Sequence, residues 1–134
     1  MINGRCACGA VRFEVEGEIE DFSHCHCSIC RRLHGAAYAS FAGVARERFR
    51  YLCGEDKIAV YASSPRNDRV FCSICGSTIL CDPQTEPERL YLSMSAVDGA
   101  PSLPAGYHQY AGSKAAWHEI ADDLPCFDSS VSAG

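Results

Sequence analysis

The sequence has no long hydrophobic run and no excess of positive charge. Its longest stretch of small apolar residues, 35–45, is interrupted by Ser40 and Gly43, whereas a membrane-spanning helix needs about 18 consecutive apolar residues. With 12 basic and 17 acidic residues, the formal net charge is −5, so no general attraction to nucleic-acid phosphates or anionic lipids is expected. These absences argue against a membrane protein and against a nucleic-acid-binding protein.

The N-terminal residues also lack the apolar core of a secretory signal peptide. Residues 1–6, Met-Ile-Asn-Gly-Arg-Cys, lead directly into a polar and glycine-containing stretch. We therefore expect a cytoplasmic protein in a reducing compartment, where the ten cysteines are not used for disulfides. A chain of 134 residues with 47% hydrophobic residues is long enough to form one domain with its own core.

The residue pattern predicts a mainly β fold with short helical turns. Residues 10–15 alternate apolar and polar side chains with the period of two that is typical of a half-buried strand. Further strands are predicted at 49–52, 57–61, 69–71 and 90–94, and helical turns at 28–34 and 45–49. Residues 129–134 are rich in serine and small residues, and we expect a flexible tail there.

Cysteines are the most informative residues that are present. Thiolates two or three positions apart can bind one small soft cation, whereas such close neighbours rarely form disulfides with each other. This spacing predicts a zinc protein. The three groups are Cys6 and Cys8; Cys25, Cys27 and Cys30; and Cys72 and Cys75.

The first and last groups together supply four thiolates. Each is followed by a glycine, Gly9 or Gly76, which permits the tight turn of a zinc knuckle. A site with four protein ligands has no vacant position, so we predict a structural zinc ion there.

The middle group offers three thiolates, which is the number of protein ligands at a catalytic zinc with one open position. His24 or His26 could supply a fourth ligand, but alternate side chains of a strand point to opposite faces. An open site with three thiolates suits the binding of an incoming thiolate better than the generation of hydroxide.

The remaining cysteines, histidines and aromatic residues have simpler interpretations. We expect isolated cysteines to be small buried hydrophobic residues, the other histidines to lie at the surface or in the core with partners, and the aromatic residues to form core or pocket wall. These residues are Cys53, Cys81 and Cys126; His34, His108 and His118; and Phe13, Phe41, Phe71, Tyr91 and Trp117.

Several motifs together resemble the glutathione-dependent formaldehyde-activating enzyme family, which includes the centromere protein V type, over about residues 3–128. The resemblance implies a compact domain, 1–128, with a Rab-exchange-factor-like zinc β fold. It also implies a structural zinc on Cys6, Cys8, Cys72 and Cys75, and an active-site zinc on Cys25, Cys27 and Cys30. The motifs are 4–13 (GRCACGAVRF), 24–31 (HCHCSICR), Gly35-Ala36, Phe41, Ser64-Pro65, 71–77 (FCSICGS), 117–120 (WHEI) and 123–125 (DLP).

The activity implied by the resemblance is that of a carbon–sulfur lyase that joins glutathione and formaldehyde as S-hydroxymethylglutathione. Glutathione carries two carboxylates, so we predict that Arg31, directly after Cys30, binds one of them, with Arg32 and Arg69 as further candidates. Small residues at Gly35 and Ala36 are expected to leave room above the metal.

Two other functions are compatible with the same residues. A zinc-stabilised binding or scaffold module would have no vacancy at the second metal. A redox enzyme would need a nucleophilic cysteine outside the metal groups, for which Cys81 and Cys126 are the candidates.

Overall fold

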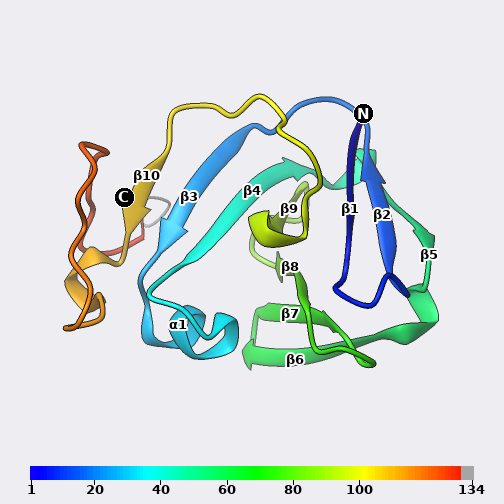
Figure 1. Cartoon of the computed structure of the whole chain (residues 1–134), viewed down its shortest axis with the longest axis horizontal. Helices are drawn as coiled ribbons and strands as arrows, with labels where there is room; N and C mark the ends of the chain where they lie inside the picture. Colours follow the sequence, from blue (N-terminus) through cyan, green and yellow to red (C-terminus); the bar gives the residue numbers. More distant parts are fainter. Residues whose placement is uncertain (131–134) are drawn as a thin grey trace.

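Residues 1–130 are described by a computed structural model, in which strands form two sheets (Figure 1). The smaller sheet is antiparallel, with the order β1-β2-β5. Its strands are β1 (Ile2–Arg5), β2 (Arg12–Val15) and β5 (Phe49–Cys53).

The larger sheet has seven strands in the order β10-β3-β4-β9-β8-β7-β6. All neighbours in it are antiparallel except β10, which runs parallel to β3. Its strands are β3 (Asp21–Cys25), β4 (Ala39–Ala45), β6 (Ile58–Ser64), β7 (Asn67–Cys72), β8 (Thr78–Pro83), β9 (Arg89–Ser93) and β10 (Tyr107–Gln109).

Helix α1 (Ser28–His34) connects β3 to β4. It begins after Cys27, whose Sγ accepts a hydrogen bond from the Cys30 amide, and it ends at Gly35, which adopts a left-handed conformation with φ 58°. Short 3₁₀ turns complete the described secondary structure: η1 (Arg46–Arg48), η2 (Glu55–Lys57), η3 (Met94–Ala96) and η4 (Ala111–Ser113).

The predicted mainly β class is confirmed, and the five predicted strands are present as β2, β5, β6, β7 and β9. Strand β2 begins two residues later than predicted. The helical turns predicted at 28–34 and 45–49 correspond to α1 and to η1 with its flanking residues.

Five strands were not predicted, and their residues explain why. Strand β4 is buried on both faces and consists mostly of small residues, so it shows no alternation of apolar and polar side chains. Strand β10 has three residues, which is too short for a periodic pattern. The others are β1, β3 and β8.

The main hydrophobic core contains buried side chains from both sheets. Phe13 and Val15 come from β2, and Ala42, Val44 and Leu92 come from β4 and β9. Each fully buried side chain of the size of valine, leucine or phenylalanine contributes about 1.5–3 kcal/mol relative to an exposed one. On β4, Ala39 and Phe41 belong instead to a second, smaller cluster together with Cys25, Cys30 and Cys81.

Three expectations about burial are wrong. Trp117 is 74% exposed, because it follows η4 in an irregular segment where its ring contacts the edge of His118 instead of the core. Cys53 is exposed because it ends the edge strand β5, and Cys126 is exposed in the C-terminal segment.

No helix among residues 1–130 is long and apolar enough to cross a membrane. Within the predicted tail, the Ser129 carbonyl accepts a hydrogen bond of 3.3 Å from the Tyr110 amide. Residues 131–134 lie outside the described residues, so the predicted boundary at residue 128 stays a prediction.

Candidate metal centre

The four-cysteine group joins two turns that are far apart in the sequence. Cys6 and Cys8 follow β1, Cys72 ends β7, and Cys75 lies in the turn before β8. All four sulfurs lie within 4.8 Å of one another. The Cys6–Cys8 and Cys8–Cys72 sulfur separations are 3.5 and 3.9 Å, and a regular tetrahedron of thiolates around zinc requires about 3.8 Å. The donor set therefore fits a tetrahedral metal ion.

Glycine turns and hydrogen bonds shape this group. Gly9 and Gly76 have φ of 78° and 79°, a backbone conformation that residues with a Cβ rarely adopt. The Cys6 sulfur accepts a hydrogen bond of 3.3 Å from the Val11 amide. The pKa of Cys75 is lowered to about 5, mainly by its side-chain hydrogen bond with Ser77.

The three-cysteine group lies where β3 meets α1. Cys25 is the last residue of β3, Cys27 is the N-cap of α1, and Cys30 lies within the helix. Their sulfurs also lie within 4.8 Å of one another. Hydrogen bonds from Cys25 and Cys30 lower the pKa of Cys27, which is the least buried of the three. Three soft sulfur donors in this arrangement fit a metal ion.

Neither adjacent histidine belongs to this three-sulfur group among residues 1–130. The Nδ1 atom of His24 is 2.7 Å from Ser40 Oγ, and the Nε2 atom of His26 is 2.8 Å from His108 Nδ1. Both rings are therefore held by other partners.

A cavity of about 570 Å³ lies beside the three-cysteine group. The strand registers explain how it is built, because alternate side chains point to the same face of a sheet. Odd-numbered residues of the large sheet line the cavity, whereas Ala42, Leu80 and Leu92 point into the main core. Ser64, at the end of β6, is the even-numbered exception. Lining residues from the sheet are Asp21 and Cys25 on β3, Phe41 on β4, Ser63 and Ser64 on β6, Asn67 and Arg69 on β7, Cys81 and Pro83 on β8, Arg89 and Tyr91 on β9, and Tyr107 and Gln109 on β10.

The cavity wall carries charges of both signs. Asp21 accepts hydrogen bonds of 3.0 Å from the Tyr107 hydroxyl, and Glu86 lies on the same wall. The Arg89 side chain is 28% exposed and forms an ion pair of 3.0 Å with Glu20. Arg69 is buried and donates a hydrogen bond to the sulfur of Cys30. A zwitterionic ligand would meet groups of opposite charge here.

The residues predicted to surround the substrate have different positions. Arg31 donates its Nε–H to the His26 carbonyl at 3.2 Å and does not line the cavity, so its role in substrate binding stays a prediction. Neither Gly35 nor Ala36 lines the cavity, and Gly35 ends α1, so the expectation that they leave room above the metal stays a prediction. Arg32, also on α1, is exposed and does not line the cavity.

Sequence reasoning missed Arg89, Tyr107 and Gln109 as cavity residues. Their odd positions on β9 and β10, which are separated by β3 and β4 in the same sheet, are a signal only once the strand registers are known. Tyr107 lies opposite Ser23, and Gln109 lies opposite Cys25.

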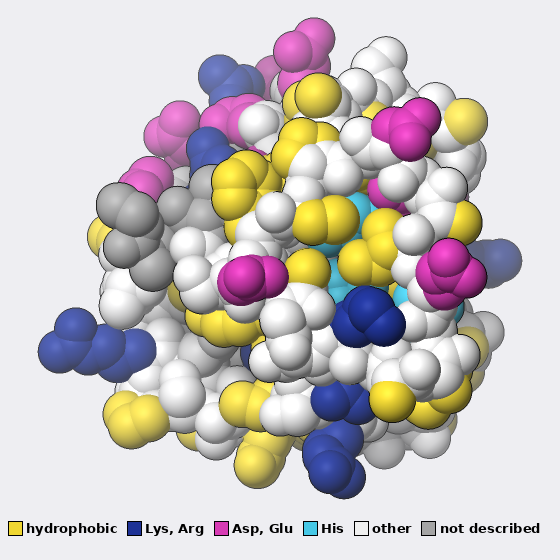
Figure 2. Space-filling model, turned by 90° about the vertical axis from the view of Figure 1, so that its left-hand side faces the viewer, with side chains coloured by type: hydrophobic (Ala, Val, Ile, Leu, Met, Phe, Trp, Pro, Cys, Tyr) yellow, Lys and Arg dark blue, Asp and Glu magenta, His cyan; other side chains and the backbone are white. Residues whose placement is uncertain are grey.

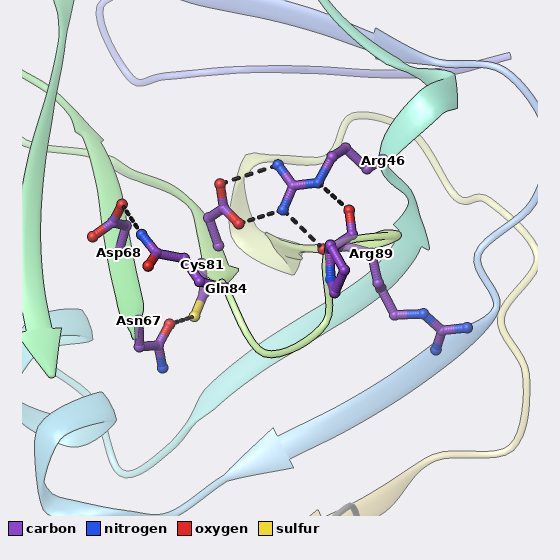
Figure 3. A network of polar contacts seen from close by, with 8 residues as sticks. Arg46, Asn67, Asp68, Cys81, Gln84 and Arg89 are labelled. Atoms are coloured by element: carbon purple, nitrogen blue, oxygen red, sulfur yellow. Dashed lines mark hydrogen bonds and ion pairs between the residues drawn. The ribbon is translucent and has the colours of Figure 1, made fainter. Parts of the chain in front are cut away.

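Cys81 is buried, as expected, and its sulfur donates a hydrogen bond of 2.7 Å to Asn67 Oδ1 (Figure 3). Burial raises the pKa of the Cys81 thiol to about 11, which makes it a poor nucleophile. Figure 3 also shows Arg46 bound to the carboxylate of Asp82, the residue after Cys81, and to the carbonyls of Pro87 and Arg89. These contacts hold β8 against the start of β9.

Histidine side chains lie in a hollow at the β10 side of the molecule, between hydrophobic groups and basic residues (Figure 2). His24 and His26 pack against both Tyr38 and His108 at ring-centroid distances of 4.9–5.0 Å. His118 packs against Tyr38 at 5.6 Å and against His26 at 6.5 Å. His108 is 1% exposed and hydrogen-bonded at both nitrogens, so the expectation of a satisfied core histidine is confirmed.

The sequence profile described as "Glutathione-dependent formaldehyde-activating enzyme" matches residues 1–113. The chain belongs to this family. A relative from Halomonas elongata that bears the name of a glutathione-dependent formaldehyde-activating enzyme is 33% identical over 130 residues, which cover 90% of this chain and 81% of the relative.

Two further relatives are similar over parts of the chain. An uncharacterised lyase of Schizosaccharomyces pombe is 29% identical over 76 residues, or 57% of this chain and 53% of the yeast protein. The crystal structure of a Rhodobacter sphaeroides protein superposes with a TM-score of 0.63 at 29% identity, covering 73% of this chain and 89% of that one.

Proposed function

We propose that the chain is a zinc-dependent carbon–sulfur lyase that acts on adducts of a thiol and an aldehyde in the cytoplasm. The reference reaction is the joining of glutathione and formaldehyde to S-hydroxymethylglutathione. In this direction a bond forms between the thiol sulfur and the aldehyde carbon, and the thiol proton passes to the aldehyde oxygen. The observation that carries the proposal is the three-cysteine group at the wall of a cavity of about 570 Å³.

Cys25, Cys27 and Cys30 would hold the active-site zinc, and Cys6, Cys8, Cys72 and Cys75 would hold the structural zinc. Zinc bound by three thiolates supplies a Lewis acid with one position for a substrate thiolate. Helix α1 and strand β3 keep the three sulfurs together at one side of the cavity. The two-sheet arrangement is compatible with the Rab-exchange-factor-like fold, which we retain as part of the proposal.

The cavity has the size and the charges that glutathione requires. Small-molecule sites usually enclose about 300–1,000 Å³. Glutathione carries two carboxylates and one ammonium group, and Arg89 lies on the same cavity wall as Asp21 and Glu86. Arg89 is the cavity cation with an exposed portion, so we propose that it binds a substrate carboxylate. Arg31 follows Cys30 directly on α1 and is proposed as the second carboxylate-binding residue, although it does not line the cavity itself.

The decisive experiment combines metal analysis with a thiol titration of protein in which cobalt replaces zinc. We expect two metal ions per chain and a change in the thiolate-to-cobalt charge-transfer absorption when glutathione is added. Formation of S-hydroxymethylglutathione from formaldehyde is then followed by NMR. Two metals with thiol binding but no turnover would favour the binding module, and an unchanged absorption would refute a substrate site at this metal.

A further inference from the structure

Arg69 is a buried cation whose partners are unusual. Its side chain lies in β7, and the residue is 7% exposed. Nη1 donates a hydrogen bond of 3.4 Å to Cys30 Sγ, and Nε donates one of 3.0 Å to Ser63 Oγ. No carboxylate of residues 1–130 lies within ion-pair distance of it.

Three other arginines of the described chain are paired with carboxylates. Arg46, Arg50 and Arg89 each form an ion pair with a carboxylate, and all three are more exposed than Arg69. A buried charge is costly unless an opposite charge compensates it. The groups that can supply this charge at Arg69 are cysteine sulfurs. The sulfur of Cys30 is the one that accepts a hydrogen bond from the Arg69 guanidinium.

The strand register explains why the guanidinium reaches these sulfurs. Arg69 lies opposite Cys81 on β8 and Tyr61 on β6, so it shares the cavity face of the sheet with Cys81. The next residue, Val70, points to the other face and belongs to the main core. A shift of β7 by one residue would remove the cation from the cavity.

We propose that Arg69 is the counter-cation of the three-cysteine site and positions Cys30 as a metal ligand. This inference rests on the metal site of the proposed function. Three thiolates and one divalent cation leave one net negative charge in a buried place, and Arg69 cancels it. Because its guanidinium is engaged by Cys30 and Ser63, Arg69 is a positioning residue, and the carboxylates of the substrate are left to Arg89 and Arg31.

The test compares the metal affinities of Arg69→Met, which removes the charge, and Arg69→Lys, which keeps it. Zinc is withdrawn by titration with the chromophoric chelator 4-(2-pyridylazo)resorcinol, and the zinc content is measured before and after. Removing an outer partner of a metal ligand typically weakens metal binding by about 10–100-fold. We expect the zinc affinity of the three-cysteine group to fall by this factor in Arg69→Met and by much less in Arg69→Lys. The zinc affinity of the four-cysteine group should be unchanged in both variants.

Arg12→Met is the matched control, because Arg12 Nε donates to the Gly9 carbonyl beside the four-cysteine group. Arg12→Met removes the same charge from the chain and should leave the zinc affinity of the three-cysteine group unchanged.

If Arg69→Met does not fold, Ser63→Ala is used as the test variant instead. This substitution removes the hydrogen-bond partner of Arg69 Nε and leaves the cation in place. A loss of a few-fold in affinity supports the inference, and an unchanged affinity contradicts it.

The outcomes separate this inference from the proposed function. Wild-type protein that binds one zinc ion would refute the second metal site and with it the function. Two zinc ions in the wild type with equal affinities in Arg69→Met would overturn only the role of Arg69. Equal losses in Arg69→Lys and Arg69→Met would show that charge compensation is not its basis.

Discussion

The Nε2 atom of His26 lies 2.8 Å from the Nδ1 atom of His108. The other nitrogen of His108 lies 3.0 Å from both carboxylate oxygens of Asp122, which can only accept hydrogen bonds when ionised. When both rings are neutral, His108 therefore donates to Asp122 and accepts from His26. Because His26 lies between Cys25 and Cys27, this chain of hydrogen bonds links the C-terminal segment to the metal-binding loop.

Replacement of His108 by phenylalanine keeps an aromatic ring at this position but removes the side-chain hydrogen bonds to His26 and Asp122. The buried Nε2–H of His26 would then have no acceptor, which costs about 1–3 kcal/mol. We expect a lower free energy of unfolding in urea by this amount. His118→Phe is the control, because the His118 ring packs against His26 and forms no hydrogen bond among residues 1–130. An equal loss in the two variants would mean that ring packing, and not hydrogen bonding, is responsible.

The lowered pKa values of two histidines predict that the protein loses stability in acid. Burial lowers the pKa of His26 and of His34 to about 4, whereas an unfolded histidine has a pKa of about 6.5. Between these values the unfolded chain binds more protons than the folded one, so the free energy of unfolding falls as the pH decreases from about 6.5 towards 4. Metal ligands also bind protons in acid, so a variant is needed to isolate the histidine contribution.

His34→Phe should make this decrease shallower, since phenylalanine cannot bind a proton and can keep the edge contact with Phe41. Urea denaturation of both proteins at several pH values between 7.5 and 4 measures the difference. Parallel curves for the variant and the wild type would contradict the prediction.

Unequal roles of the two cysteine groups predict unequal effects of cysteine substitution. Cys8→Ser leaves an incomplete tetrahedron at the four-cysteine group, whose binding energy would also stabilise the fold, so we expect loss of cooperative folding. Cys27→Ser should lose one metal ion and remain folded. Circular dichroism together with metal analysis tests both, and complete unfolding of Cys27→Ser would show that both groups are structural.

Substrate carboxylates provide a test for the two proposed arginines. Arg89→Ala and Arg31→Ala should each weaken glutathione binding by about 1–3 kcal/mol, the range for a lost hydrogen bond to a charged group. Binding of 2-mercaptoethanol, which has no carboxylate, should stay nearly unchanged. Titration calorimetry with both thiols measures this.

Arg31 has a second possible outcome because it already donates to the carbonyl of His26. Equal losses for glutathione and 2-mercaptoethanol in Arg31→Ala would assign it to the support of the metal loop. No loss for either thiol would remove it from the site.

The sequence by itself determined the features that depend on near neighbours. The spacings of Cys25, Cys27 and Cys30 put three sulfurs at one strand–helix junction, and Cys27 caps the helix that follows. Alternating residues identified β2 and other half-buried strands. Strands buried on both faces, such as β4, carry no such alternation and were missed.

Only the tertiary structure decided which residues surround the three-cysteine group. Arg69, Arg89 and Gln109 come from three strands that are distant in the sequence, and each reaches the cavity because its register places an odd-numbered residue on that face. A shift of one residue in any of these strands would turn its side chains to the opposite face. Strand register is set by the packing of the whole core. The local sequence therefore could not reveal that Arg69 donates a hydrogen bond to the sulfur of Cys30.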